Sequence, residues 1–138
     1  YFATFPGVRR YMTDVVERAK ETGYVETIFR RRRALPELKS SNFNTRSFGE
    51  RVALNMPVQG AAADIIKLAM VKVHKELKER NLRSRLILQV HDELLVEASR
   101  ECAHKAAEIL RCEMENAVKL SVPLSVELTI GDTWYENK

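Results

Sequence analysis

The sequence has few of the features that mark secreted or membrane proteins. Cysteine is scarce: Cys102 and Cys112 lie far apart in a predicted helical segment, which indicates neither a disulfide nor a metal site. We expect both to be buried or half-buried thiols in a reducing compartment. A signal peptide is missing, and no apolar run approaches the roughly 20 residues that a membrane span needs. These absences favour a cytoplasmic protein without a membrane partner.

Turn-forming residues are missing where they would be most expected. Between two short apolar runs rich in Val, Ile and Leu, the chain carries His91, Asp92 and Glu93 in place of Gly, Asn or Pro. The runs are typical of strands, which puts the triplet at the tip of a β-hairpin from about Arg85 to Glu97. Adjacent carboxylates at a rigid tip suit Mg²⁺, which takes oxygen ligands and completes its shell with waters and substrate phosphates. The alternative is a turn that is polar only because turns are polar, which explains Asp but not Glu or His.

Positive charge is in excess and clustered. The formal net charge is +4, and the basic residues gather as Arg9, Arg10, Arg30, Arg31, Arg32, Arg33, Lys72, Lys75, Lys78, Arg80, Arg83 and Arg85. Such clusters suggest a polyanionic partner. An ordinary solvated face is the better interpretation for Lys72–Lys78, where glutamates intervene. The arginine run can hold phosphates, but alternate residues of a strand point to opposite faces, so not all four can contact one nucleic-acid strand.

The pattern of elements predicts an α+β fold. With 45% hydrophobic residues, the chain is suited to one globular domain or a large part of one, and its start at Tyr1 without Met suggests a piece of a longer chain. Antiparallel strands with helices on one face are expected from the element order. The expected elements are a helix from Pro6 to Thr22 capped by Gly23, a strand from Tyr24 to Phe29 with a return from Arg31 to Leu35, a loop to Asn44, a helix from about Thr45 ended or kinked near Pro57, a helix from there to about Arg80, the hairpin, a helix from Ser99 to about Lys119, and a strand from Leu124 to Ile130.

Three polar side chains are spaced to share a helix face. Arg51, Asn55 and Gln59 follow one another at intervals of four residues, so a modest bend at Pro57 would leave them on one side. All three can donate hydrogen bonds to the acceptors that a duplex minor groove presents at nearly every base pair. The alternative is a polar face without a ligand.

The longest of these motifs resemble a known family. ERVALNMPVQGAAADIIK at residues 50–67, followed by QVHDE at residues 89–93, is similar to the C-terminal part of family A DNA polymerases, the DNA polymerase I type. The similarity covers the whole chain, including Gly23–Thr27, Lys39–Asn42 and Gly131–Trp134. It implies a right-hand polymerase with an antiparallel palm sheet, a catalytic hairpin and long packing helices. Residues 1–38 would end the fingers, and residues 39–138 would form the C-terminal part of the palm.

The resemblance also implies roles. Asp92 would be a catalytic aspartate that binds two Mg²⁺ ions with a second aspartate, Glu93 would support it, and His91 would help to place the primer terminus. Arg51, Asn55 and Gln59 would contact the minor groove. The partners would be primer–template DNA, deoxynucleoside triphosphates and the upstream part of the same chain, in replication and repair at the bacterial nucleoid.

The chain also departs from the family pattern. Arg30 stands where the family usually has Gly, and would strain its turn by about 1 kcal/mol if φ there is positive. The family's first catalytic aspartate and its nucleotide-binding fingers helix precede Tyr1, so the isolated fragment is predicted to be inactive. Two alternatives stay open: a non-enzymatic nucleic-acid-binding α+β module, which needs exposed aromatics on its sheet, and a small metal-dependent phosphodiesterase, which needs a further carboxylate cluster.

Overall fold

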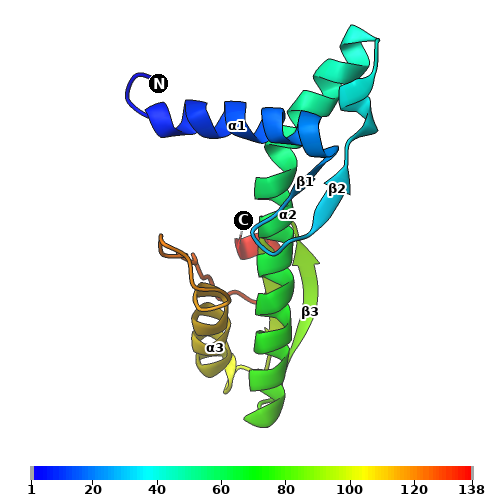
Figure 1. The fold of residues 1–138 in the computed structure, drawn as a ribbon. Coiled ribbons are helices and arrows are strands. Elements are labelled where there is room, and N and C mark those ends of the chain that lie inside the picture. The colour runs from blue at the N-terminus through cyan, green and yellow to red at the C-terminus, as the bar shows by residue number, and fades with distance from the viewer. Residues whose placement is uncertain (1, 138) are drawn as a thin grey trace. The chain divides into compact units, whose positions relative to one another are not determined.

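The structure is a computed structural model that describes residues 2–137. It consists of two compact units, Tyr1–Ala62 and Ala63–Lys138, and the longest helix runs from the first into the second. Figure 1 traces the elements in chain order, which are α1 Pro6–Thr22, β1 Tyr24–Glu26, β2 Arg32–Ala34, the 3-10 helix η1 Pro36–Lys39, α2 Phe43–Glu79, β3 Ser84–Val90, β4 Glu93–Ala98, α3 Ala103–Glu115 and the 3-10 helix η2 Trp134–Asn137. The mixture of helices and antiparallel strand pairs confirms the α+β prediction. The strands of the described chain form two separate two-stranded sheets.

Helix α1 begins and ends where the sequence predicts. Pro6 occupies the first turn, where its missing N–H costs no hydrogen bond. Gly23 then leaves the helix with φ 83°, and its N–H donates to the Ala19 carbonyl at 2.8 Å. The Gly23 carbonyl accepts a hydrogen bond from the Leu35 N–H at 2.8 Å. This bond joins the residue after β2 to the residue before β1.

The first hairpin is shorter than predicted. Strands β1 and β2 pair antiparallel with Tyr24 opposite Ala34 and Glu26 opposite Arg32. The prediction that the first strand continues to Phe29 is wrong, because the chain turns at Thr27, whose N–H donates to the Arg31 carbonyl at 2.9 Å. Arg30 has φ 64°, so this arginine does occupy a left-handed position.

Helix α2 runs without interruption from Phe43 to Glu79, so the prediction that a helix ends at Pro57 and a second one starts there is wrong. Its start is also earlier than predicted, because the Asn42 side-chain oxygen accepts hydrogen bonds from the N–H groups of Asn44 (2.9 Å) and Thr45 (3.2 Å) and so caps the first turn. The helix supplies Ala53 to the core of the first unit, with Ala19, Val25, Leu35 and Leu38. In the second unit it supplies Ala69, Val73 and Leu77 to the core. Burial in two cores outweighs the one hydrogen bond that Pro57 removes.

The second unit is built on the antiparallel pair β3–β4. Leu94 of β4 packs in the same core as Ala106 and Ile109 of α3. A bulge in β3 between Leu86 and Leu88 leaves Ile87 outside the regular pairing. Helix α3 is shorter at both ends than predicted, and past its end Lys72 Nζ donates to the carbonyls of Asn116 (2.8 Å) and Ala117 (3.0 Å).

Two further predictions about this unit are wrong. Residues 124–130 form no strand in the described chain, and the Val126 N–H donates to a side chain, Glu115 Oε1, at 3.1 Å. A strand needs a neighbouring backbone, and neither β3 nor β4 is paired with this segment. Cys112 is exposed, although a buried or half-buried thiol is predicted, whereas Cys102 is half-buried as expected. Within residues 2–137, no helix is long and apolar enough to cross a membrane.

Candidate active site and nucleic-acid interface

The tip of the β3–β4 hairpin is a two-residue loop of His91 and Asp92. Val90 pairs with Glu93, so the hairpin turns at the predicted triplet, and Glu93 is the first residue of β4. His91 has φ 52°, and Asp92 is not among the residues with positive φ. Gly adopts such a positive φ readily, whereas the Cβ of other residues is crowded there. His91 therefore stands where backbone sterics favour Gly, at a cost of about 1 kcal/mol.

A side chain that the sequence did not single out holds this turn. Gln89 Nε2 donates a hydrogen bond to the His91 carbonyl at 2.6 Å, across the start of the loop. Leu94, next to Glu93, is buried in the core of the second unit and anchors the other arm. The strained backbone at His91 is thus fixed from both strands, a feature found where a turn presents functional groups.

The carboxylates of Asp92 and Glu93 are exposed, and neither forms a hydrogen bond or ion pair within residues 2–137. Two free carboxylates with oxygen donors are suited to a hard divalent cation. In that part of the chain, however, no group of three or more His, Cys, Asp or Glu side chains lies close enough to hold a metal ion. The tip can supply part of a metal site, and the remaining ligands have to come from other groups. A self-contained metal-dependent phosphodiesterase therefore lacks support.

Two other aspartates of the chain, Asp64 and Asp132, have different environments. Asp64 lies on α2 with 8% of its surface exposed. Asp132 Oδ1 accepts from Arg100 Nη2 at 2.9 Å in an exposed ion pair. Neither belongs to a cluster of possible metal ligands.

The polar face of α2 lies within the first unit. Arg51, Asn55 and Gln59 are all exposed, and the helix that carries them is uninterrupted at Pro57, so they lie along one side of it. Arg51 Nη1 donates to Ser47 Oγ at 3.2 Å, one turn earlier on the same side. The side-chain amides of Asn55 and Gln59 have no hydrogen-bond partner in the described residues and are free to donate to a ligand. We call Arg51, Asn55 and Gln59 the polar stripe.

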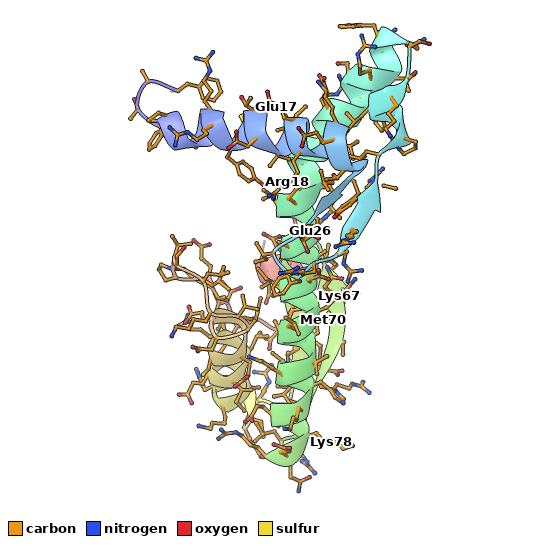
Figure 2. All side chains as sticks on the ribbon, viewed as in Figure 1. Glu17, Arg18, Glu26, Lys67, Met70 and Lys78 are labelled. Atoms are coloured by element: carbon orange, nitrogen blue, oxygen red, sulfur yellow. The ribbon has the colours of Figure 1, made fainter. Side chains whose placement is uncertain are left out.

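The arginine run is divided between the faces of the β1–β2 hairpin. Arg32 Nε donates to Oε2 of Glu26, which is labelled in Figure 2, at 3.0 Å. The Arg32 guanidinium also lies 4.6 Å from the centre of the Tyr24 ring. Arg33 pairs with Val25 and so points to the opposite face from Arg32. This division confirms that the four arginines do not share one face. Arg32 already has an internal carboxylate partner.

An aromatic stacking platform is not present on the strands. β3 and β4 contain no aromatic residue, and Tyr24 of β1 is covered by the Arg32 guanidinium. A nucleic-acid-binding module that stacks bases on its sheet is therefore not supported by the described strands.

Comparison with known proteins identifies the family. The model for DNA polymerase family A matches residues 1–136. DNA polymerase I of Bacillus caldotenax is 53% identical over all 138 residues, which correspond to 16% of its length, and DNA polymerase I of Bacillus subtilis is 51% identical over the same extent and share. The solved POL domain of Pol1 from M. smegmatis, in complex with DNA primer-template and dNTP, superposes with a TM-score of 0.87 at 52% identity over 91% of this chain and 22% of that one.

These matches place the fold in the class of right-hand polymerase domains. The chain belongs to DNA polymerase family A. It spans 16% of the length of the relatives cited above.

Proposed function

We propose that this chain is the part of a DNA-directed DNA polymerase that carries one of its catalytic carboxylates, and that the complete enzyme adds deoxynucleotides to a primer 3′-hydroxyl. The observation that carries the proposal is the β3–β4 tip, where exposed Asp92 lies in a turn held by a hydrogen bond from Gln89, in a chain that belongs to DNA polymerase family A. In this assignment residues 1–38 end the fingers and residues 39–138 form the C-terminal part of the palm.

Asp92 and Glu93 would form the metal-binding part of the site. Family membership suggests dependence on a divalent metal ion, and exposed carboxylates fit Mg²⁺, of which the complete enzyme would use two. When bound, such ions activate the attacking oxygen and stabilise the leaving oxygens of a phosphoryl transfer. Asp92 would be a direct ligand and Glu93 a supporting carboxylate. His91, whose carbonyl is held by Gln89, would position the primer end.

The polar stripe and the arginines would bind the primer–template duplex. Arg51, Asn55 and Gln59 would donate to purine N3 and pyrimidine O2 in the minor groove, which tests the shape of a base pair and not its sequence. Arg31 and Arg33 would contact phosphates. Arg32 would contribute less, because Glu26 neutralises its charge.

The remaining partners follow from the same assignment. Deoxynucleoside triphosphates would be the substrates, and the rest of the polymerase chain would supply the second catalytic aspartate. The enzyme would act in replication and repair in the cytoplasm, at the bacterial nucleoid.

The test is Asp92→Ala in a complete polymerase chain that contains these 138 residues. Loss of a metal-binding carboxylate should slow single-turnover primer extension by at least about 10³-fold and leave the Kd for primer–template within about tenfold. Asp132→Ala is the matched control: it removes an exposed carboxylate paired with Arg100, and extension should stay within about twofold because exposed pairs contribute little. Retention of more than about a tenth of the rate in Asp92→Ala would refute the metal-ligand role.

A further inference from the structure

Thr27 organises the turn between β1 and β2. It is 4% exposed, and its Oγ1 accepts hydrogen bonds from the N–H groups of Phe29 (3.2 Å) and Arg31 (3.3 Å). Its own backbone adds two more bonds: the Thr27 N–H donates to the Arg31 carbonyl, and the Arg30 N–H donates to the Thr27 carbonyl, each at 2.9 Å. A single buried residue, Thr27, therefore fixes the backbone of the turn in which the arginine run begins.

The same residue packs against α2 at Gly60. A Cβ added at Gly60 would lie 2.7 Å from Thr27 Cγ2, closer than side-chain carbons approach one another. The next neighbours, Met56 Cε and Sδ, would lie 3.6 and 3.8 Å away, which is ordinary contact. Only the Thr27 methyl group therefore requires Gly at this position. Gly60 follows Gln59 directly, so the contact lies at one end of the polar stripe.

We infer that Thr27 and Gly60 are positioning residues that hold the β1–β2 turn and the polar stripe of α2 as one duplex-binding surface. The Thr27 methyl fits against the bare backbone at Gly60, and the Thr27 hydroxyl orients the turn that leads into Arg31 and Arg33. A duplex has fixed spacing between its phosphates and its minor-groove acceptors. The arginines and the polar stripe can therefore contact one duplex together only if the distance between them is fixed. The contact between Thr27 and Gly60 fixes that distance. The inference rests on the proposed DNA-binding role of the two elements.

The contact can be broken and restored in a complete polymerase chain that contains these residues. Gly60→Ala introduces the overlap, and Thr27→Ser in the same chain removes Cγ2 while it keeps Oγ1, so the double variant has room for the new Cβ. Thr27→Val keeps both branches of the side chain but removes the acceptor for the Phe29 and Arg31 N–H groups. Gly7→Ala is the matched control, because a Cβ at Gly7 on α1 would meet nothing within 4 Å.

The readouts are kcat/KM for extension, the Kd for a primer–template duplex, and the slope of log Kd against log salt. A displacement of about 1 Å should lower kcat/KM by on the order of 10- to 100-fold in Gly60→Ala, and the double variant should recover to within about threefold. Gly60→Ala and Thr27→Val should each lower the salt slope by about one, as expected for the loss of a phosphate contact. Gly7→Ala should match the parent. A purely structural role would lower the melting temperature without changing the salt slope of the folded enzyme.

Two results would overturn the inference: a double variant as weak as Gly60→Ala alone, or an unchanged affinity and salt slope in Thr27→Val. The second result decides the matter even if Gly60→Ala does not fold. Arg33→Ala and Arg51→Ala separate this inference from the proposed function. If these two bind duplex as well as the parent, the DNA-binding surface itself is wrongly assigned. If they bind weakly while the Thr27 and Gly60 variants bind normally, only the positioning role fails.

Discussion

The two hairpins of this chain share a backbone feature, a non-Gly residue with positive φ, but their turns are held in different ways. Each turns through a residue other than Gly in the left-handed region, Arg30 at φ 64° and His91 at φ 52°. The β1–β2 turn is buried at Thr27 and fixed by four hydrogen bonds of that residue. The β3–β4 tip is exposed, and the Gln89 side chain supplies the hydrogen bond that holds it. The hydrogen bonds of buried Thr27 thus fix the first turn and position the arginines that follow it. The second turn is held by a hydrogen bond at its base, which leaves its carboxylates free.

The largest expected effect concerns catalysis by the chain alone. Because neither hairpin brings a third metal-binding side chain to Asp92 and Glu93 in the described residues, these 138 residues should not extend a primer with Mg²⁺ and all four nucleotides. A primer-extension assay on the rigorously purified chain checks this. Template-dependent extension that disappears with Asp92→Ala would mean that the chain assembles a complete site by itself.

A smaller effect is expected when the strain at His91 is relieved. His91→Gly suits the positive φ, so the β3–β4 hairpin should become more stable by up to about 1 kcal/mol, measured by amide hydrogen exchange in β3 and β4. Extension by the complete polymerase should nevertheless fall by on the order of tenfold, because the side chain that positions the primer is lost. His91→Ala, which loses the side chain but keeps the strain, is the control. Equal hydrogen exchange in the two variants would show that the φ value carries no cost.

Next in size is the support from Gln89. Gln89→Leu removes the donor to the His91 carbonyl and should destabilise the hairpin by about 1 kcal/mol. Single-turnover extension should slow by several-fold, since the tip that carries Asp92 is held less firmly. The comparison is Gln59→Leu, which should weaken duplex binding and leave the hydrogen exchange of β3 and β4 unchanged. A normal extension rate in Gln89→Leu would show that the exposed tip keeps its geometry without this bond.

The smallest effect is expected at Arg30. Arg30→Gly should stabilise the β1–β2 turn by up to about 1 kcal/mol, seen as slower exchange of the Thr27 N–H, with extension within about twofold of the parent. Arg33→Gly, at a strand position, should destabilise the hairpin by about 0.5–1 kcal/mol. A large loss of duplex affinity in Arg30→Gly would mean that this side chain, and not only its neighbours, contacts DNA.

What the sequence could and could not predict follows from how local each signal is. The bounds of α1 and the position of the β3–β4 tip were predictable, because Pro6, Gly23 and the alternation of apolar runs act over a few residues. The continuity of α2 through Pro57 was not, since it depends on burial in two cores. The strand expected at 124–130 failed because pairing requires a partner that no local pattern reveals.

The candidate site divides in the same way. Asp92 and the spacing of the polar stripe were read from the sequence, and the roles assigned to them remain predictions. The supporting residues Gln89, Thr27 and Gly60 were missed, because each acts through a contact with another segment. For Gly60, the one available signal was a glycine inside a helical pattern, where it costs about 1 kcal/mol relative to Ala.

The proline in α2 has a consequence for how this chain opens. Without an N–H at Pro57, the carbonyl one turn earlier, at Ala53, lacks its usual helical donor. The helix is about 55 Å long at its regular rise, and this gap lies between the side chains it gives to one core and those it gives to the other. Local unfolding that starts in one unit can therefore stop most easily at this missing hydrogen bond. The two ends of the helix can then exchange their amide protons at different rates.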